Sequence, residues 1–385
     1  MIYEIFFPAV FIAAVMLIFF IIAGYPAVMF AISRLWPRHT VHADLWPRVS
    51  LIIAARNEQR DIAAKLENAL ALHYPKDLLQ IIVASDCSED GTDKIVEGFA
   101  DRGVSLNRQN TRSGKTRAQY RAARVSNGDI LVFSDATTIL EPDSLRKMLR
   151  AFADPSVGCV AGRLVYRSEG PSAVATGCIS YWDYESQLKS WESRAGSLVG
   201  VSGCFYAVRR SCHAELASDM IDDFVIATEM RLRGLRSVYE PEAVCSESAN
   251  HRSPTEFRMR VRVIEQTMNA LERYNHLLNE SDHGMFKFQI FCHKTLRYSL
   301  PLILLLAFVA NSLALGAGVF YECAFFGQVL FYLLAIIGWR LARSGVELGP
   351  LALPYYFVLI NTAAVFAFVK FMRGESQVVW EPLRD

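Results

Sequence analysis

The sequence predicts an α/β domain with a mostly parallel sheet flanked by helices, joined to transmembrane α-helices. Strand-like apolar runs alternate with helical patterns from residue 49 to residue 135, and such alternation forms a parallel sheet with both faces covered. Residues 5–33 contain no charged side chain, and this run is long enough to cross a bilayer. A second apolar zone begins near Tyr298.

A retained membrane helix is expected in residues 1–37. The uncharged run IFFPAVFIAAVMLIFFIIAGYPAVMFAIS is too long for the apolar core of a signal peptide, and no basic segment precedes it. Arg34, Arg38 and Arg48 follow it. Because Lys and Arg gather in cytoplasmic flanks, the next domain is expected in the cytoplasm, against the inner or plasma membrane.

Residues 38–280 are expected to form that cytoplasmic domain. Apolar runs predict its main strands, VSLIIAAR (49–56), LQIIVASD (79–86) and DILVFSD (129–135). A shorter run, VSLN, predicts a further strand. Helical patterns lie between the strands, in EQRDIAAKLENALALH, EDGTDKIVEGFADRG and TRAQYRAARVS.

Residues 281–385 are expected to hold an interfacial helix and the C-terminal transmembrane helices. The runs that can span are YSLPLILLLAFVANSLALGAGVF, AFFGQVLFYLLAIIGW with its flanks, and LALPYYFVLINTAAVFAFVKFM. Basic side chains precede them, at Lys287, His293, Lys294 and Arg297. If all these runs cross, the C-terminus lies on the far side, whereas Lys370, Arg373 and Arg384 favour the cytoplasmic side. Either one run does not cross, or the charge rule fails here.

The main strands all end in polar residues. The first ends at Arg56, the second at Asp86 and the third at Asp135. Each alone is typical of a turn or a helix cap. Ligands of open α/β sheets bind beyond the carboxyl ends of the strands, so the coincidence predicts a ligand cleft. The sequence has neither a dinucleotide fingerprint nor a P-loop, although Lys115 in TRSGKT could reach a phosphate.

Composition excludes some classes of protein and of site. The net charge of +1 argues against a dedicated nucleic-acid binder. The eight cysteines contain no C-x-x-C pair, and cytoplasmic thiols stay reduced, so neither disulfides nor a zinc site is expected.

Several segments, taken in order, resemble one known family. They are AARNEQRDIAAKLENALALHYP, IIVASDCSEDGT, SGKTRAQYRAARVSNGDILVFSDAT and VSGCFYAVRR followed by IDDF. This order resembles the family 2 inverting glycosyltransferases, which have a GT-A nucleotide-sugar domain. It is most similar to their membrane-embedded branch, which includes the hyaluronan, cellulose and poly-N-acetylglucosamine synthases. The resemblance covers roughly residues 48–275.

The resemblance implies a site for a nucleotide-sugar donor, with UDP as the nucleotide. Ala55, Arg56 and Glu58 lie where the family's first strand meets the nucleotide. Asp86 would face the uracil or its ribose, and Lys115 would approach the nucleotide.

The same resemblance implies a metal contact and a catalytic base. Asp135 stands at the first acid of the family's D-x-D motif, and Thr137 stands at the second. Gly203 would line the donor sugar. Asp223, the last acid of IDD, matches the catalytic base, and Asp222 is expected among the substrate-binding residues.

The chemistry of displacing a nucleoside diphosphate explains these residue types. The leaving group gains negative charge, so Mg²⁺ or Mn²⁺ is expected at Asp135, with the diphosphate and waters completing its shell. Arg262 is expected to contact phosphate, the alternative being a cation at the membrane interface. Asp223 would accept the proton of the acceptor hydroxyl, unless Asp222 and Asp223 only complement a helix dipole. Adjacent acids cannot share one helical face, so one is expected to point into the cleft and one away.

The acceptor side is less defined. Aromatic residues in YWDYESQLKSW either stack on a sugar or lie in an amphipathic helix at the membrane surface, namely Tyr181, Trp182, Tyr184 and Trp191. The family's Q-x-x-R-W motif is replaced by Met259, Arg262 and Val263 at the corresponding positions. In processive synthases the Trp helps to bind the growing chain, so its absence favours a shorter reaction.

The resulting prediction is an inverting hexosyl- or N-acetylhexosaminyltransferase. It would move a sugar from a nucleotide donor to a glycan acceptor, in exopolysaccharide synthesis. A single transfer to a membrane lipid is the alternative. A non-catalytic sensor or scaffold would not need donor, metal and base residues together, and a transporter would place ionisable residues inside its spans.

Overall fold

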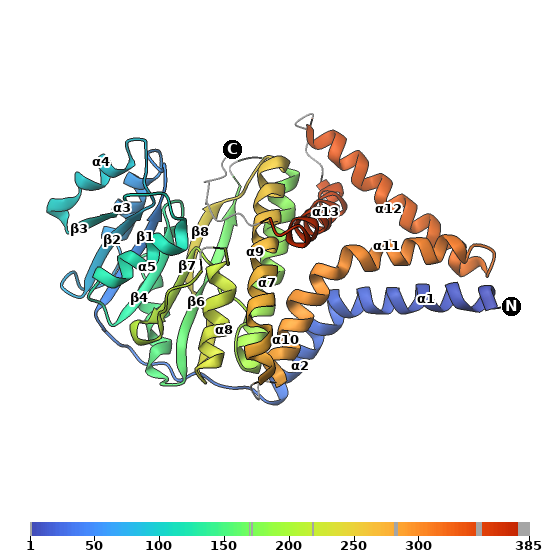
Figure 1. Ribbon diagram of the computed structural model, residues 1–385, viewed down its shortest axis with the longest axis horizontal. Coiled ribbons are helices and arrows are strands. Elements are labelled where there is room, and N and C mark those ends of the chain that lie inside the picture. The colour runs from blue at the N-terminus through green and yellow to red at the C-terminus, as the bar shows by residue number, and fades with distance from the viewer. Residues whose placement is uncertain are drawn as a thin grey trace.

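The computed structural model describes residues 2–168, 170, 172–217, 219–280, 284–343 and 349–375. In that part of the chain an eight-stranded sheet lies beside long helices that extend away from it (Figure 1). The strand order is β3-β2-β1-β4-β7-β6-β8-β5. The strands are β1 (Val49–Ala55), β2 (Leu79–Ser85), β3 (Val104–Arg108), β4 (Ile130–Asp135), β5 (Ile139–Leu140), β6 (Val157–Arg167), β7 (Phe205–Arg209) and β8 (Arg236–Ser248).

One half of the sheet is parallel, as predicted. β1 lies between β2 and β4, with Ala55 opposite Ser85 and Ala54 opposite Asp135. All seven residues of β1 are buried, because helices cover both faces. The carboxyl ends of these strands therefore meet at one edge of the sheet.

The other half is mixed. β7 runs antiparallel to β4 and β6, β8 pairs parallel with β6, and β5 pairs antiparallel with β8. Phe205, the first residue of β7, pairs with Ser134 near the end of β4. The antiparallel direction of β7 thus brings residues 200–204 to the edge that holds Asp135.

Two layers of shorter helices cover the sheet. Successive strand side chains point to opposite faces, so Leu51 and Ile53 pack on one layer while Ile52 packs on the other. The first layer contains α3 (Ile62–Leu70), α4 (Thr92–Glu97) and α6 (Ser144–Leu149). The second contains α5 (Lys115–Val125) and α8 (Asp222–Leu232).

Two long helices separate the sheet from the apolar helices (Figure 1). They are α7 (Ala173–Ala195) and α9 (Ser253–Glu280). α7 packs on β6, β8 and α2, whereas α9 packs on α8 and α13. Ser172 caps α7, because its hydroxyl accepts a hydrogen bond from the Ala175 N–H.

Among the described residues, four segments are long and apolar enough to cross a membrane. They are Ile5–Leu35, Gly284–Leu313, Val319–Arg343 and Gly349–Met372. The first comprises α1 (Ile2–Phe19), a π-helical turn (Phe20–Gly24) and α2 (Tyr25–Leu35). The second comprises α10 (Gly284–Ile290), a π-helical turn (Phe291–Leu296) and α11 (Arg297–Leu313). The last two contain α12 (Val319–Arg343) and α13 (Ala352–Met372).

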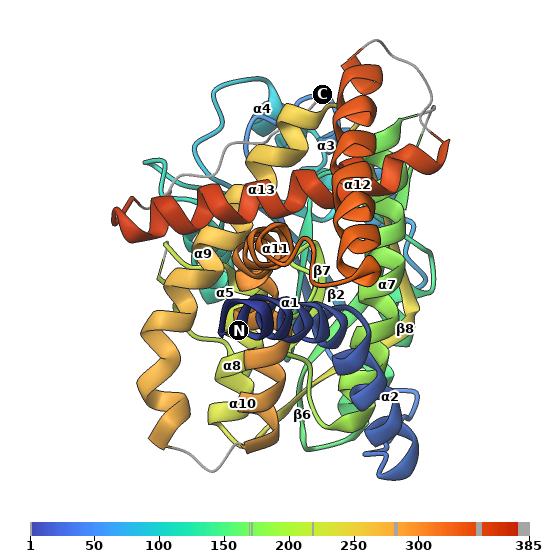
Figure 2. The same cartoon turned by 90° about the vertical axis from the view of Figure 1, so that its right-hand side faces the viewer.

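These helices do not all run in one direction. α1 and α11 run side by side and lie lengthwise in Figure 1, whereas α13 is seen end on there. In Figure 2, α13 lies lengthwise and α1 and α11 point at the viewer. α13 therefore runs across α1 and α11, against α9 and α7. The domain limits at 1–37, 38–280 and 281–385 stay predictions, and Arg384 lies outside the described residues.

Candidate active site

A cavity of about 1160 Å³ opens at the carboxyl edge of the sheet and continues between the apolar helices. Six residues predicted from the sequence line it: Lys115, Asp135, Gly203, Asp222, Asp223 and Arg262. They come from five separate parts of the chain. Asp135 ends β4, Lys115 begins α5, and Asp222 and Asp223 begin α8. The sheet edge and two helix N-termini thus converge on one space.

Lys115 joins the end of β4 to the loop before β7. Its Nζ lies 2.7 Å from Asp135 Oδ1 and donates to the Gly203 carbonyl over 3.1 Å. Burial lowers the pKa of Lys115, but the charges of Asp135 and Asp222 outweigh this effect and raise it overall. Lys115 is therefore a fixed positive charge at the centre of this edge.

Asp222 and Asp223 both line the cavity, so the expectation that one points away is wrong. The cavity surrounds the start of α8, where the chain enters from an extended Ile221, and both side chains reach it. Asp222 Oδ1 accepts the Asp223 N–H, and its other oxygen is buried without a hydrogen-bond partner among the described residues. Burial raises the pKa of Asp222 to about 6, with Lys115 opposing the shift.

Gly203 lies in the middle of these charges. A Cβ added there would lie 3.4 Å from Asp222 Oδ1, 3.7 Å from the Asp223 Cβ and 4.0 Å from Lys115 Nζ. The Val201 N–H donates to the Asp223 carbonyl over 3.0 Å, which holds the loop against α8. The short loop before β7 is therefore the floor of the site.

Two predicted residues join the loops after β1 and β2. The Arg56 guanidinium donates to the Asp86 carbonyl over 2.7 Å and lies 3.3 Å from Glu89. The Asp86 carboxylate accepts the N–H groups of Ser113 and Gly114, at 2.7 and 3.0 Å. Arg56 and Asp86 thus set the loop that begins α5 and positions Lys115. They are not among the described residues that line the cavity.

Three further predicted residues also lie outside the cavity wall that the structure describes. Ala55 is buried at the end of β1. Glu58 is buried too, and its N–H donates to Thr92 Oγ1 over 2.7 Å. Thr137 is exposed in the turn after β4. The donor contacts predicted for these residues therefore stay predictions.

Arg262 and Glu247 complete the donor side of the cavity. Arg262 lies on α9, among the charges of Asp135 and Asp222, and makes no hydrogen bond or ion pair with any described residue. It faces the acids rather than only the membrane. Glu247 of β8 accepts a hydrogen bond from Thr138, and burial and the Asp135 charge raise its pKa.

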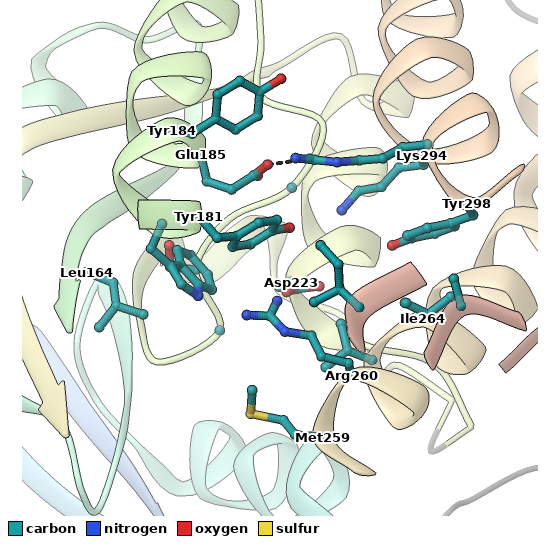
Figure 3. A pocket seen from close by; sticks show the side chains of 18 of the residues that line it. Leu164, Tyr181, Tyr184, Glu185, Asp223, Met259, Arg260, Ile264, Lys294 and Tyr298 are labelled. Atoms are coloured by element: carbon teal, nitrogen blue, oxygen red, sulfur yellow. Dashed lines mark hydrogen bonds and ion pairs between the residues drawn. The ribbon is translucent and has the colours of Figure 1, made fainter. Parts of the chain in front are cut away.

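The far wall of the cavity carries charge from α7, α9 and the start of α11. Figure 3 shows the amine of Lys294 pointing into the cavity beside Tyr181, near Asp223. Arg297 pairs with Glu185, and its guanidinium lies 5.2 Å from the Tyr181 ring centroid. Tyr181, Trp182 and Tyr184 line the cavity, and both alternatives for the aromatic stretch stay predictions. Trp191 instead packs on Phe30 of α2, with ring centroids 5.4 Å apart.

The oxygen donors at this edge fit a hard divalent cation. The described residues include no group of three or more His, Cys, Asp or Glu that could hold a metal ion. The Asp222 oxygen without a hydrogen-bond partner shows that the edge has unused capacity for a cation. Protein carboxylates would thus supply only part of a metal shell, as in sites completed by a diphosphate and waters.

Comparison with known families shows which proteins resemble the part of the chain that forms this edge. The family described as "Glycosyl transferase family 2" matches residues 50–216, which include the cavity residues Lys115, Asp135 and Gly203. The segment from residue 50 to residue 216 is therefore similar to the family 2 glycosyltransferases. The fold of the chain is the GT-A fold, with a mixed sheet flanked by helices.

Relatives of this chain include proteins named as polysaccharide synthases. The chain is 28% identical over 212 residues to the poly-beta-1,6-N-acetyl-D-glucosamine synthase of Staphylococcus aureus strain COL, covering 53% of this chain and 51% of that protein. It is 26% identical over 208 residues to the synthase of the same name from Staphylococcus epidermidis, covering 51% and 49%. The chain spans about half the length of the curated relatives it matches.

A solved structure matches the chain along nearly its whole length. It is the mannosyltransferase PcManGT of Pyrobaculum calidifontis, in complex with GDP-Man and Mn²⁺. The TM-score is 0.75 at 23% identity, over 96% of this chain and 99% of the other. The likeness therefore extends from the sheet to the apolar helices.

Sequence reasoning missed several residues around the cavity. Glu247 is one of three acids in the sequence of β8, where acids alternating with apolar residues are an ordinary solvent-facing pattern. The positions of Lys294 and Arg297 before an apolar segment indicate only charges that orient the membrane helices. The signal that could have found them is an ionisable group inside an apolar segment, which usually faces a cavity or a partner.

Proposed function

We propose that the protein is an inverting glycosyltransferase that moves a sugar from a nucleotide donor to a hydroxyl group. The observation that carries this proposal is the meeting of Asp135, Lys115, Asp222, Asp223 and Arg262 around Gly203 in one cavity. Acids and cations in this arrangement suit both a leaving diphosphate and a base. We take UDP as the nucleotide, because the resemblance implies it.

The donor diphosphate would lie against Lys115 and Arg262. Lys115 is held charged by Asp135, and Arg262 has a guanidinium that is free to bind phosphate oxygens in pairs. Asp135 would hold Mg²⁺ or Mn²⁺ together with the diphosphate. Asp222 and Glu247 both lie within the field of the Asp135 carboxylate, so either could help to bind the cation. Bound there, the cation would neutralise charge that develops on the leaving group.

Asp223 would act as the base. The acceptor oxygen attacks the anomeric carbon, the bond from that carbon to the donor phosphate breaks, and the hydroxyl proton passes to the Asp223 carboxylate. A single direct displacement inverts the anomeric configuration. Asp222, whose pKa burial raises to about 6, would bind substrate beside it.

Two kinds of acceptor remain for this site. The staphylococcal relatives are named as synthases of a glycan polymer, which favours a glycan acceptor in exopolysaccharide synthesis. A membrane lipid is the second candidate. It is favoured by Val263 at the position of the family's Trp and by the apolar end of the cavity.

The test is transfer from a panel of labelled nucleotide sugars by purified membranes, with Mn²⁺, with Mg²⁺ and with EDTA. Replacing Asp223 by Asn should lower transfer by about 10²–10⁴-fold, because the general base is lost. EDTA should lower it to background. A ladder of products would mean polymer synthesis, and one product soluble in organic solvent would mean a lipid acceptor.

The matched control is Asp219→Asn. Asp219 lies three residues before Asp222, pairs with Arg273 over 3.7 Å and is not among the residues that line the cavity. That variant should transfer sugar at the normal rate. Unchanged transfer in Asp223→Asn would overturn the assignment of the base, and no transfer from any donor would overturn the proposed function.

A further inference from the structure

The acceptor would lie at the far wall of the cavity, which α7, α9 and the start of α11 form. The described side chains there carry one more positive charge than negative charge. Arg297 pairs with Glu185, and Arg260 Nε lies 2.8 Å from Glu256 Oε1. His293, which also lines the cavity, pairs with Glu192, with 2.7 Å between His293 Nδ1 and Glu192 Oε1. Lys189 and Lys294 then face Asp223 as the remaining acid. The site therefore attracts an anion beside the proposed base.

Lys294 is the group that would meet this anion. It lines the cavity and makes no hydrogen bond or ion pair with any described residue. A Cβ added at Gly200 would lie 3.8 Å from Lys294 Nζ and 3.7 Å from the Asp223 carbonyl oxygen, so the loop at Gly200 lies between the two residues. Lys189 is more constrained, because it donates to Ser202 Oγ over 2.9 Å and to the Val201 carbonyl. An ammonium without a partner, held near a carboxylate, is typical of a ligand-binding group.

The same cavity continues into apolar surroundings. Beyond Lys294 its wall is formed by Leu300 of α11, Phe331 of α12, and Phe357 and Ile360 of α13. These elements belong to the segments long and apolar enough to cross a membrane. A second cavity of about 520 Å³ adjoins the first, and Tyr298 and Ala364 line both. The space beyond the charged end therefore suits hydrocarbon rather than a second sugar.

We propose that the acceptor is an anionic membrane lipid whose head group carries a free hydroxyl. Its phosphate would lie at Lys294, its hydroxyl at Asp223, and its hydrocarbon chain between α11, α12 and α13. The inference rests on the proposed function and names the substrate class of that site. In the reaction, the head-group oxygen bonds to the anomeric carbon, the donor diphosphate leaves, and the hydroxyl proton goes to Asp223. The lipid phosphate takes no part in bond making.

The first test uses the full chain in nanodiscs with the labelled donor panel. One set contains phosphatidylcholine alone, and others add phosphatidylglycerol, phosphatidylinositol or phosphatidic acid. Labelled product soluble in organic solvent is expected with phosphatidylglycerol or phosphatidylinositol. Phosphatidic acid has an anionic head without a free hydroxyl, so it should compete without giving product. Product from phosphatidylcholine alone, or equal use of soluble glycerophosphoglycerol, would overturn the proposal.

Paired variants test the two ends of the lipid site. Lys294→Gln should raise the KM for the lipid about tenfold or more, since one hydrogen bond to a charged group is lost. Lys370→Gln is its control, because Lys370 is also near the membrane helices but does not line either described cavity. Ile360→Trp should fill the apolar end and raise the same KM severalfold. Ile337→Trp, on the exposed face of α12, should not change it.

A binding measurement separates this inference from the proposed function. Native mass spectrometry of the detergent-purified chain should show retained anionic lipid in the wild type and in Asp223→Asn, but less in Lys294→Gln. Retention does not require catalysis. If Asp223→Asn abolishes sugar transfer while Lys294→Gln and Lys370→Gln retain equal lipid, the proposed function stands and the lipid acceptor is wrong.

Discussion

Gly203 explains how charged side chains of opposite sign share one small space. With no side chain there, Lys115 approaches the loop carbonyl while Asp222 and Asp223 approach from α8. The Asp222 carboxylate is then within the field of the Lys115 ammonium, so this buried acid is partly compensated before any substrate binds. At the scale of single residues, the site is a balanced set of charges rather than one reactive group.

A half-buried histidine, His213, gives a pH dependence of stability that is independent of substrate. His213 stacks on Phe133 and Tyr120, with ring centroids 5.2 and 6.0 Å away. Burial, with Arg210 adding to it, lowers its pKa to about 4. As pH falls below 6.5, the unfolded chain takes up a proton that the folded chain does not, so stability falls until about pH 4. This group alone accounts for a loss of up to about 3 kcal/mol.

His213→Phe should keep the stacking and remove that loss. Between pH 6.5 and 4, its free energy of unfolding in detergent should fall less steeply than that of the wild type. His276→Phe, at an exposed position on α9, is the control and should keep the wild-type slope. An unchanged slope in His213→Phe would contradict this account.

Most of the residues at the donor edge can be predicted, because the local pattern of apolar residues indicates where each strand begins and ends. β1, β2 and β4 each end within a residue of the predicted end, and parallel pairing then forces Arg56, Asp86 and Asp135 to one edge. The sequence does not show how far each side chain reaches. Arg56 and Asp86 turn toward neighbouring loops, and only Asp135 enters the cavity. The position of β7 depends on pairing between distant segments, which local pattern does not encode.

At the scale of elements, a buried polar cluster holds α9 to α13. Tyr356 donates to Glu256 over 2.7 Å and accepts from Arg260 over 2.8 Å. α7 joins them closely, because a Cβ on Gly177 would lie 2.4 Å from the Tyr356 Cβ. Since α9 also carries Arg262, the apolar helix α13 helps to set the distance between that guanidinium and the sheet edge.

Removing one hydroxyl should loosen this contact. Tyr356→Phe leaves Glu256 and Arg260 each short of a buried partner and should destabilise the protein by about 1–3 kcal/mol. Tyr355→Phe is the control, because its hydroxyl bonds only the partly buried Ser253 among described residues. Thermal unfolding in detergent measures both. Equal melting temperatures for the two variants would show that this cluster does not stabilise the contact between α9 and α13.

At the scale of the whole molecule, the crossing direction of α13 bears on the conflict over the C-terminus. No Lys or Arg lies between Arg297 and Arg340, so the α11–α12 turn has no basic residue. Arg340, Arg343, Lys370 and Arg373 all lie toward the ends of α12 and α13. If α13 lies along the membrane face rather than through it, these charges share the side of the glycosyltransferase domain, as the charge rule requires. Hydropathy could not decide this, because it measures length and polarity but not direction.

Labelling of single cysteines tests this arrangement. In a chain with Cys87 and Cys323 changed to Ser, the remaining cysteines are buried. Ala317→Cys, in the α11–α12 turn, should react with a membrane-impermeant maleimide on intact cells. Arg373→Cys, after α13, should react only once the membrane is permeabilised. Reaction of both on intact cells would mean that α13 crosses.

The start of α11 makes the position of the charged end of the cavity depend on the thickness of the bilayer. Lys294 and Arg297 lie in a segment that continues directly into α11, and the apolar length of that helix must match the hydrocarbon layer. A thinner layer tilts such a helix, and the tilt would move both cations relative to Asp223. The rate of sugar transfer would then report on how thick the surrounding membrane is, and cells that remodel their lipids would adjust this protein without touching its active-site residues.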